Sequence, residues 1–264
     1  MININLISKD INNIRELTPV VHNITNYVVM NTTANALLAI GASPIMAHEL
    51  QEVKDMIAIA SSLVLNIGTL DKKNVDAMLL AGKIAKEKGI PIVFDPVGVG
   101  ATAYRTEVAN NILNQCKPTI IRGNASEILS LQNITTTSKG VDSSVASDKA
   151  LQAAKQLALQ SQAIVVVSGQ IDYITDGQAV ITVKNGHPLM EKVTGMGCTA
   201  TAIIAAFSAI NSNALLAASH AMIIMGIAGE LAAKLARGNG SMQMYFLDEL
   251  FNINKKTIQD NILP

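Results

Sequence analysis

The sequence is poor in charge, in aromatic residues and in cysteine. Only 15% of its 264 residues are charged and 3% are aromatic, without a single tryptophan. Its 20 basic side chains balance 20 acidic ones and form no Lys/Arg cluster. A chain without a positive field is not expected to bind nucleic acid. Because the charged fraction lies well below the usual quarter, the chain has more surface to bury than one monomer normally needs, which favours an oligomer.

The two cysteines, Cys116 and Cys198, can form neither a disulfide framework nor a CxxC metal site. Such low cysteine usage is typical of a reducing compartment, so we expect a cytoplasmic protein. The N-terminus shows no basic segment followed by an apolar run, and no signal peptide is expected. The segment most like a membrane span, 214–229, contains Ser219 and His220 and is shorter than the roughly 20 residues that cross a bilayer. It predicts a buried helix and no membrane partner.

Short β-branched runs alternate with longer segments of helical spacing. The predicted strands are 63–67, 91–95, 119–122 and 164–168, and the predicted helices between them are 74–87, 103–116 and 148–160. Asp71 and Ser147 are expected to cap two of these helices. A hairpin turning at Asp176-Gly177 and two apolar helices, 197–210 and 214–236, follow. The pattern predicts an α/β fold with a mostly parallel central sheet and helices on both faces, in a single domain over residues 1–264.

The predicted strands end in polar residues or glycine turns. These strand ends carry Asn66 with Gly68, Asp95 with Gly98, Arg122 with Asn124, and Ser168 with Gly169. In open α/β sheets, ligands bind at the carboxyl ends of the strands. The set therefore indicates a ligand site at one edge of the sheet, although ordinary strand-to-loop transitions are also polar.

A glycine-rich turn, Gly195-Met196-Gly197-Cys198, runs directly into the apolar helix predicted at 197–210. Glycines allow a ligand to approach the backbone, and the start of a helix presents unpaired N–H groups with partial positive charge. This combination is suited to binding phosphate or to stabilising a phosphoryl group in transfer. In the first turn, the pKa of the Cys198 thiol is expected to fall below its usual value of about 8.5. The alternative is a tight turn with a packed cysteine.

Two carboxylates, Asp95 and Glu127, follow predicted strands close to this turn. Near a phosphate site they could hold Mg²⁺, directly or through water. Arg122 offers a forked donor suited to phosphate oxygens. The alternative for Glu127 is a carboxylate in the first turn of a helix, where the helix dipole stabilises it.

Other motifs are weak or missing. The GxGxxA stretch at 98–103 follows a strand, but no acidic residue lies about 20 positions further on, where a dinucleotide-binding site needs one. The sequence has no P-loop and no GxSxG elbow, and its four histidines lack metal-ligand spacing. His22 and Cys116 are predicted to be structural.

Six further segments stand in order along the chain: PVVHNITN at 19–26, GASPIMA at 41–47, NIGTL at 66–70, FDPVG at 94–98, RGNASE at 122–127 and TGMGCT at 194–199. Together they resemble the hydroxyethylthiazole kinase family, which belongs to the ribokinase-like superfamily. The resemblance runs from about residue 19 to Leu250. It implies transfer of the ATP γ-phosphoryl group to the primary hydroxyl of 4-methyl-5-(2-hydroxyethyl)thiazole, with Mg²⁺, in thiamine biosynthesis or salvage. It also implies a homotrimer with active sites between subunits.

The resemblance assigns roles to individual residues. It places Met46 and Gly195 at the thiazole, Arg122 and Ser168 at ATP, the turn Gly195, Met196, Gly197 and Cys198 at the transferring phosphoryl group, and Asn26, Asp95 and Glu127 around the metal and phosphates. Cys198 occupies the place where other ribokinase-like kinases carry an aspartate base. Met196 stands where a small residue is usual, and altered kinetics rather than lost activity is expected from it. Met242 stands where Phe is usual in the nucleotide pocket.

Three alternatives compete with this interpretation. A related kinase acting on hydroxymethylpyrimidine or pyridoxal should carry Asp at position 198, and so should a dehydratase that repairs hydrated nicotinamide cofactors. A non-catalytic trimer that kept the fold is disfavoured because Asp95, Arg122, Glu127 and Cys198 are all present.

Overall fold

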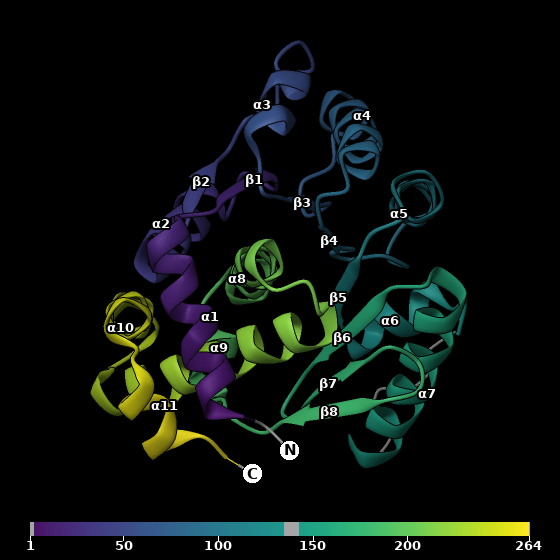
Figure 1. The fold of residues 1–264 in the computed structure, drawn as a ribbon. Coiled ribbons are helices and arrows are strands. Elements are labelled where there is room, and N and C mark those ends of the chain that lie inside the picture. The colour runs from purple at the N-terminus through teal and green to yellow at the C-terminus, as the bar shows by residue number, and fades with distance from the viewer. Residues whose placement is uncertain (1–2, 135–142, 264) are drawn as a thin grey trace.

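A computed structural model describes residues 3–134 and 143–263. Within them the strands form one eight-stranded sheet, in the order β2-β1-β3-β4-β5-β6-β7-β8 (Figure 1). β1 through β6 pair in parallel, whereas β7 and β8 are antiparallel to their neighbours. The strands are β1 Val20–Ile24, β2 Ser43–Ile45, β3 Ser62–Asn66, β4 Ile92–Asp95, β5 Ile120–Asn124, β6 Ile164–Ser168, β7 Asp172–Thr175 and β8 Val180–Val183. The predicted mostly parallel sheet is confirmed.

Helices cover both faces of the sheet and make three layers (Figure 1). One face is covered by α1 Ile4–Leu17, α2 Met30–Ile40, α8 Met196–Ile210, α9 Ala214–Leu235, α10 Asn239–Asn252 and α11 Lys255–Asn261. The other is covered by α3 Val53–Ile59, α4 Lys72–Lys88, α5 Ala103–Cys116, α6 Ala125–Leu131 and α7 Ser143–Ser161. A short 3₁₀ helix, η1 Pro188–Lys192, precedes α8.

Each strand supplies side chains to both cores because successive residues of a strand point to opposite faces. In β4, Val93 enters the core beneath α8, while Ile92 and Phe94 enter the core beneath α4 and α5. Since both faces are buried, these strands are hydrophobic throughout, which is why they are visible in the sequence as continuous apolar runs.

The helix α9 is long and apolar enough to cross a membrane by length and composition, but 72% of its most apolar window is buried inside the protein. In Figure 1 it lies within the helical layer beside α8 and α10. The predicted buried helix at this position is confirmed.

Two local predictions are wrong. Asp71 does cap α4, accepting from the Asn74 N–H at 3.0 Å, but α7 begins at Ser143, so Ser147 lies inside the helix instead of at its N-cap. The hairpin does not have a two-residue turn at Asp176-Gly177, because β8 begins only at Val180. Oδ1 of Asp176 accepts from the backbone N–H groups of Gln178 and Ala179 and stabilises a longer loop.

Candidate active site

The glycine-rich turn forms the N-terminus of α8. Gly195 has φ +83°, and a Cβ there would lie 2.6 Å from Cγ1 of Val29, so only glycine fits. The helix begins at Met196 without a capping side chain. Its first N–H groups, at Met196, Gly197 and Cys198, therefore remain available to an anion, as the sequence predicts.

A chain of hydrogen bonds joins this turn to the ends of three strands. Asn26, just after β1, donates through Nδ2 to Oδ1 of Asn66 at 2.8 Å and to Sγ of Cys198 at 3.4 Å. Asn66 at the end of β3 donates to Oδ2 of Asp95 at 2.8 Å. Thr201 of α8 donates to the same oxygen at 2.8 Å. The structure thus brings together Asn26, Asp95 and Cys198, three of the predicted site residues.

Burial dominates the electrostatics of Asp95. It raises the carboxyl pKa from an ordinary 3.8 to about 6, with a smaller upward contribution from Glu127, while Arg122 opposes the shift. Oδ2 has two donors, but Oδ1 is buried and has no partner among the described residues. An orphaned carboxylate oxygen at this position is an open ligand for a cation or a water molecule.

The predicted low pKa of Cys198 is wrong. Burial raises the pKa of the thiol to about 11, and the nearby Asp95 carboxylate acts in the same direction. The amides of Asn66 and Asn26 and the Arg122 guanidinium favour the thiolate, but they do not outweigh the loss of water. Cys198 is a neutral thiol at physiological pH.

Arg122 and Ser168 meet beside the glycine turn. Arg122 Nη2 donates to Ser168 Oγ at 2.5 Å. The guanidinium lies against Gly197, where an added Cβ would collide with Nη1. Its Nε is buried without a partner, and the bond to Ser168 is the one hydrogen bond that the guanidinium makes among the described residues, so the fork keeps N–H donors for a ligand. The structure brings these residues together as predicted.

A cleft of about 850 Å³ opens at this point, within the usual size of small-molecule sites. Arg122, Ser168, Met196 and Gly197 line it. Most of its wall comes from parts of the chain that the sequence did not single out as a site, namely 170–172, 184–191 and one side of α9. Among these residues, Asp172 is buried, which raises its carboxyl pKa to about 6.

Glu127 holds two loops through its carboxylate. Oε2 accepts from the Asn124 N–H at 2.8 Å, while Asn124 Oδ1 accepts from the Glu127 N–H at 3.0 Å, which makes a capping box at the start of α6. Oε1 accepts from the Gly98 N–H at 2.9 Å. Glu127 thus has the helix-capping role that the sequence left open as the alternative. It also ties the loop after β4 to α6.

Neither Met46 nor Met242 is among the residues that line the cleft. Met46 follows β2, the edge strand, and its carbonyl oxygen is 3.0 Å from Nδ1 of His48. Nε2 of that histidine accepts from the Thr25 N–H at 3.1 Å, so His48 connects the segment leading to Asn26 with Met46. Met242 is fully buried in the core beneath α10 and does not line the cleft, so its effect on a nucleotide pocket would be indirect.

Sequence reasoning gave no individual role to three supporting residues. Arg105 of α5 donates to the carbonyls of Ile67, Gly68 and Val97 at 2.6–2.8 Å, and so fixes the loops after β3 and β4. Nothing local in the sequence shows this, because the contacts span up to 38 positions. Asn66 was visible only as a polar strand end. Thr201 could have been found one helical turn after Cys198, on the same face of the predicted helix.

The parallel sheet, the polar strand ends and the glycine turn at α8 define the ribokinase-like class of α/β proteins. A ribokinase-like superfamily protein of Enterococcus faecalis shares the fold, with a TM-score of 0.65 and 14% identity over 93% of this chain and 88% of that one. The sequence model of the Hydroxyethylthiazole kinase family matches residues 11–256, and this chain belongs to that family.

Two relatives illustrate the relationship. A hydroxyethylthiazole kinase of Syntrophus aciditrophicus is 52% identical over 246 residues, which are 93% of this chain and 91% of the relative. The structure of a hydroxyethylthiazole kinase from Pyrococcus horikoshii matches with a TM-score of 0.91 and 40% identity over 98% of both chains. The resemblance seen in the six sequence segments is confirmed.

Proposed function

We propose that this chain transfers the γ-phosphoryl group of ATP to the primary hydroxyl of 4-methyl-5-(2-hydroxyethyl)thiazole in thiamine biosynthesis or salvage. Membership of the kinase family supports a phosphotransferase. The observation that carries the proposal is the position of the uncapped N-terminus of α8, where Gly197 lies against the Arg122 guanidinium and Cys198 lies near the Asp95 carboxylate. Substrate and nucleotide can then meet at the N–H groups of one turn.

ATP is proposed to occupy the cleft of about 850 Å³. Arg122 would contact its phosphates, with Ser168 fixing the guanidinium plane through their hydrogen bond. Phosphoryl transfer proceeds through a loose transition state, so alignment and charge stabilisation matter more than a strong base. The N–H groups of Met196, Gly197 and Cys198 would stabilise the charge that develops on the phosphoryl oxygens.

Cys198 is proposed to contact the reacting hydroxyl. As a thiol with a pKa near 11 it is not ionised at neutral pH, so it would position the reacting hydroxyl by a hydrogen bond, and the hydroxyl proton would pass late in the transfer to an oxygen of the transferred phosphoryl group. Asn26, which donates to Sγ at 3.4 Å, holds the thiol in place. No ionised base is needed at Cys198 because little proton abstraction is needed early in a loose transition state.

The residues present fit a magnesium ion at Asp95. Its Oδ1 is buried and lacks a partner within the described part of the chain, and Mg²⁺ commonly binds to proteins through one or two carboxylates while keeping several waters. No cluster of three or more His, Cys, Asp or Glu side chains suited to a metal occurs within residues 3–134 and 143–263. Asp95, with Asn26 and Glu127 through water, would hold the ion, which would neutralise charge on the phosphates.

Met46 and Gly195 are proposed to contact the thiazole ring, in a site completed by a second subunit of a cytoplasmic homotrimer. Support comes from Tyr27 and Val28, which are 60% and 63% exposed although they directly follow Asn26 of the site. Large exposed apolar side chains beside a site are typical of a protein interface.

A coupled ADP-release assay tests the proposal, with ATP, Mg²⁺ and hydroxyethylthiazole, and with hydroxymethylpyrimidine and pyridoxal in parallel. Release specific to the thiazole, with thiazole phosphate confirmed by mass, is expected. Turnover of another alcohol instead would overturn the substrate assignment. No ADP release with any of the three alcohols would overturn the assigned kinase reaction and favour the dehydratase or the non-catalytic alternative.

A further inference from the structure

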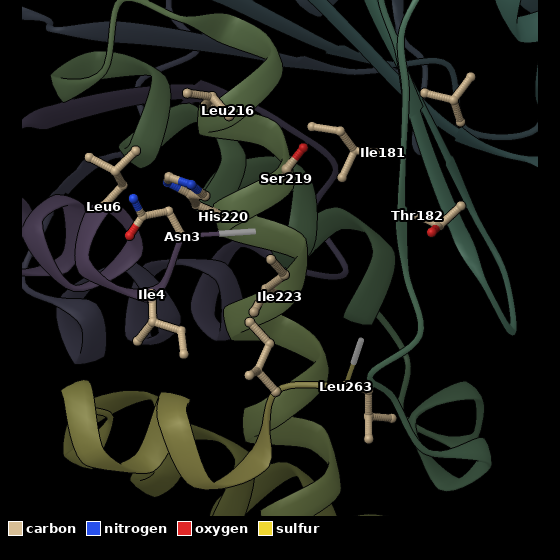
Figure 2. A pocket seen from close by; sticks show the side chains of 12 residues that line it. Asn3, Ile4, Leu6, Ile181, Thr182, Leu216, Ser219, His220, Ile223 and Leu263 are labelled. Carbon is tan, nitrogen blue, oxygen red and sulfur yellow. The ribbon is translucent and has the colours of Figure 1, made fainter. Parts of the chain in front are cut away.

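A second cavity, of about 550 Å³, lies away from the cleft and shares no lining residue with it. Figure 2 shows it between the start of α1, the edge strand β8 and one face of α9. Aliphatic side chains form most of its wall, among them Ile4, Ile181, Leu216 and Ile223. None of the residues that line it is Lys, Arg, Asp or Glu.

One buried polar group in this wall, the imidazole of His220, has a ring nitrogen that is free to form a hydrogen bond with a ligand. His220 of α9 is only 3% exposed, and its Nδ1 lies 2.7 Å from Oδ2 of Asp10 on α1. The same oxygen accepts from Nδ2 of Asn211 at 2.8 Å. Because Asp10 is an acceptor, Nδ1 of the ring carries the proton. Nε2 is then the nitrogen left for a ligand, and it has no hydrogen-bond partner among the described residues.

Of the other three polar side chains of the wall, Thr182 is exposed on β8, and Ser219 and Asn3 form hydrogen bonds within the protein. Ser219 donates through Oγ to the Leu215 carbonyl at 2.7 Å. Asn3 accepts through Oδ1 from the Asn5 N–H at 3.0 Å, as the N-cap of α1. In Figure 2 the ring of His220 stands among the side chains of Leu6, Leu216 and Asn3. The cavity therefore combines an aliphatic body with a hydrogen-bonding position at His220.

These features select the chemistry of the ligand. A neutral imidazole offers a lone pair at Nε2 and a protonated one offers an N–H, and a hydroxyl group matches either state. A carboxylate or phosphate would enter an apolar space without a counter-ion and close to the negative charge of Asp10, and an ammonium group would lose its hydration there. We propose that this cavity is a binding site for a small neutral alcohol, whose apolar body lies on the aliphatic wall and whose hydroxyl bonds to Nε2 of His220.

The test uses 2-phenylethanol as a neutral probe, titrated into the full chain labelled at its isoleucine methyl groups and followed by NMR. Saturable shifts are expected at Ile4, Ile181, Ile223 and Ile262, with a Kd of about 1 mM or tighter for a probe of this size. Phenylacetate and 2-phenylethylamine, of the same shape but charged, should bind at least about tenfold more weakly. No saturable shift at these methyl groups, or equal binding of a charged analogue, would overturn the proposal.

Two variants locate the probe. His220→Asn keeps an N–H donor at the position of Nδ1 for Asp10 and removes Nε2, so the affinity should fall about tenfold, the effect of one hydrogen bond. Ile181→Trp fills the cavity and should abolish the shifts at the remaining three isoleucines. Leu80→Trp, on α4 across the sheet, is the matched control and should change nothing. Wild-type affinity in both cavity variants would place the probe elsewhere and refute the assignment.

Discussion

Replacing Asp95 by Asn should make the protein more stable while it lowers the activity. The amide oxygen can take over the two hydrogen bonds that Oδ2 accepts from Asn66 and Thr201. The NH₂ group then replaces Oδ1, which already lacks a partner within the described residues. What the substitution removes is a buried negative charge at the carboxyl end of β4.

The magnitude follows from the pKa of Asp95. An unfolded value of 3.8 and a folded value of about 6 differ by about two units, which corresponds to about 3 kcal/mol at about 1.4 kcal/mol per unit. Because the folded state holds its proton more tightly, this destabilisation is absent below pH 4, develops between pH 4 and 6, and is complete above pH 6. At pH 7.5, Asp95→Asn should raise the Tm by roughly 6–12 °C.

Thermal unfolding of both proteins from pH 4 to 8, without nucleotide and in EDTA, measures the effect. The difference in stability should grow between pH 4 and 6 and then level off. Asp55→Asn, an exposed carboxylate on α3, is the control and should shift the Tm by little at any pH. The kinase rate of Asp95→Asn should fall by at least about 10². A variant that is no more stable than the wild type at pH 7.5 would refute the argument that burying this ionised carboxylate destabilises the folded state.

Three further predictions concern the same site. Cys198→Ala should lower kcat by about 10²–10⁴ at saturating thiazole and ATP, and an unchanged kcat would show that the thiol has no part in catalysis. Alkylation of wild-type Cys198 by iodoacetamide should also stay slow until the pH approaches 11. Glu127→Gln should raise the Mg²⁺ concentration needed for half-maximal rate. It should also lower the free energy of unfolding by about 1–3 kcal/mol, because the new NH₂ group would face the N–H of Gly98 or of Asn124. A normal Mg²⁺ titration would leave Glu127 with its capping role alone. Arg122→Lys should raise the KM for ATP about tenfold or more by losing the guanidinium fork, and a wild-type KM would exclude that contact.

The sheet and its ligand edge were predictable because they depend on local signals. Buried parallel strands are visible as apolar runs. The polar residues that end them, such as Asp95 and Arg122, lie at one edge of the sheet whatever the order in which the strands are connected. The glycine turn was predictable for the same reason: Gly195 and Gly197 flank the first residue of an apolar helix.

What could not be predicted depends on contacts between distant parts of the chain. The pKa of Cys198 is predicted to fall because a helix N-terminus is a local feature, whereas burial and the Asp95 carboxylate, which raise it, depend on how distant parts of the chain pack around the turn. The support that Arg105 gives to two loops and the wall of the cleft around Asp172 have the same origin. The predicted two-residue turn is wrong for a different reason: the side chain of Asp176 binds the backbone N–H groups that follow it in the loop.

The two covers of the sheet are completed at different times as the ribosome makes the chain. Helices α3 to α7 lie between consecutive strands in the chain, but α8, which packs on β1, β3 and β4, begins at Met196, about 100 residues after β4 ends. At 5–20 residues per second, roughly 5–20 s pass before it is made. Until then the face containing Val21, Val64 and Val93 stays open to water and to other chains. Since α8 also carries the glycine turn, the step that removes this hazard is the step that assembles the site.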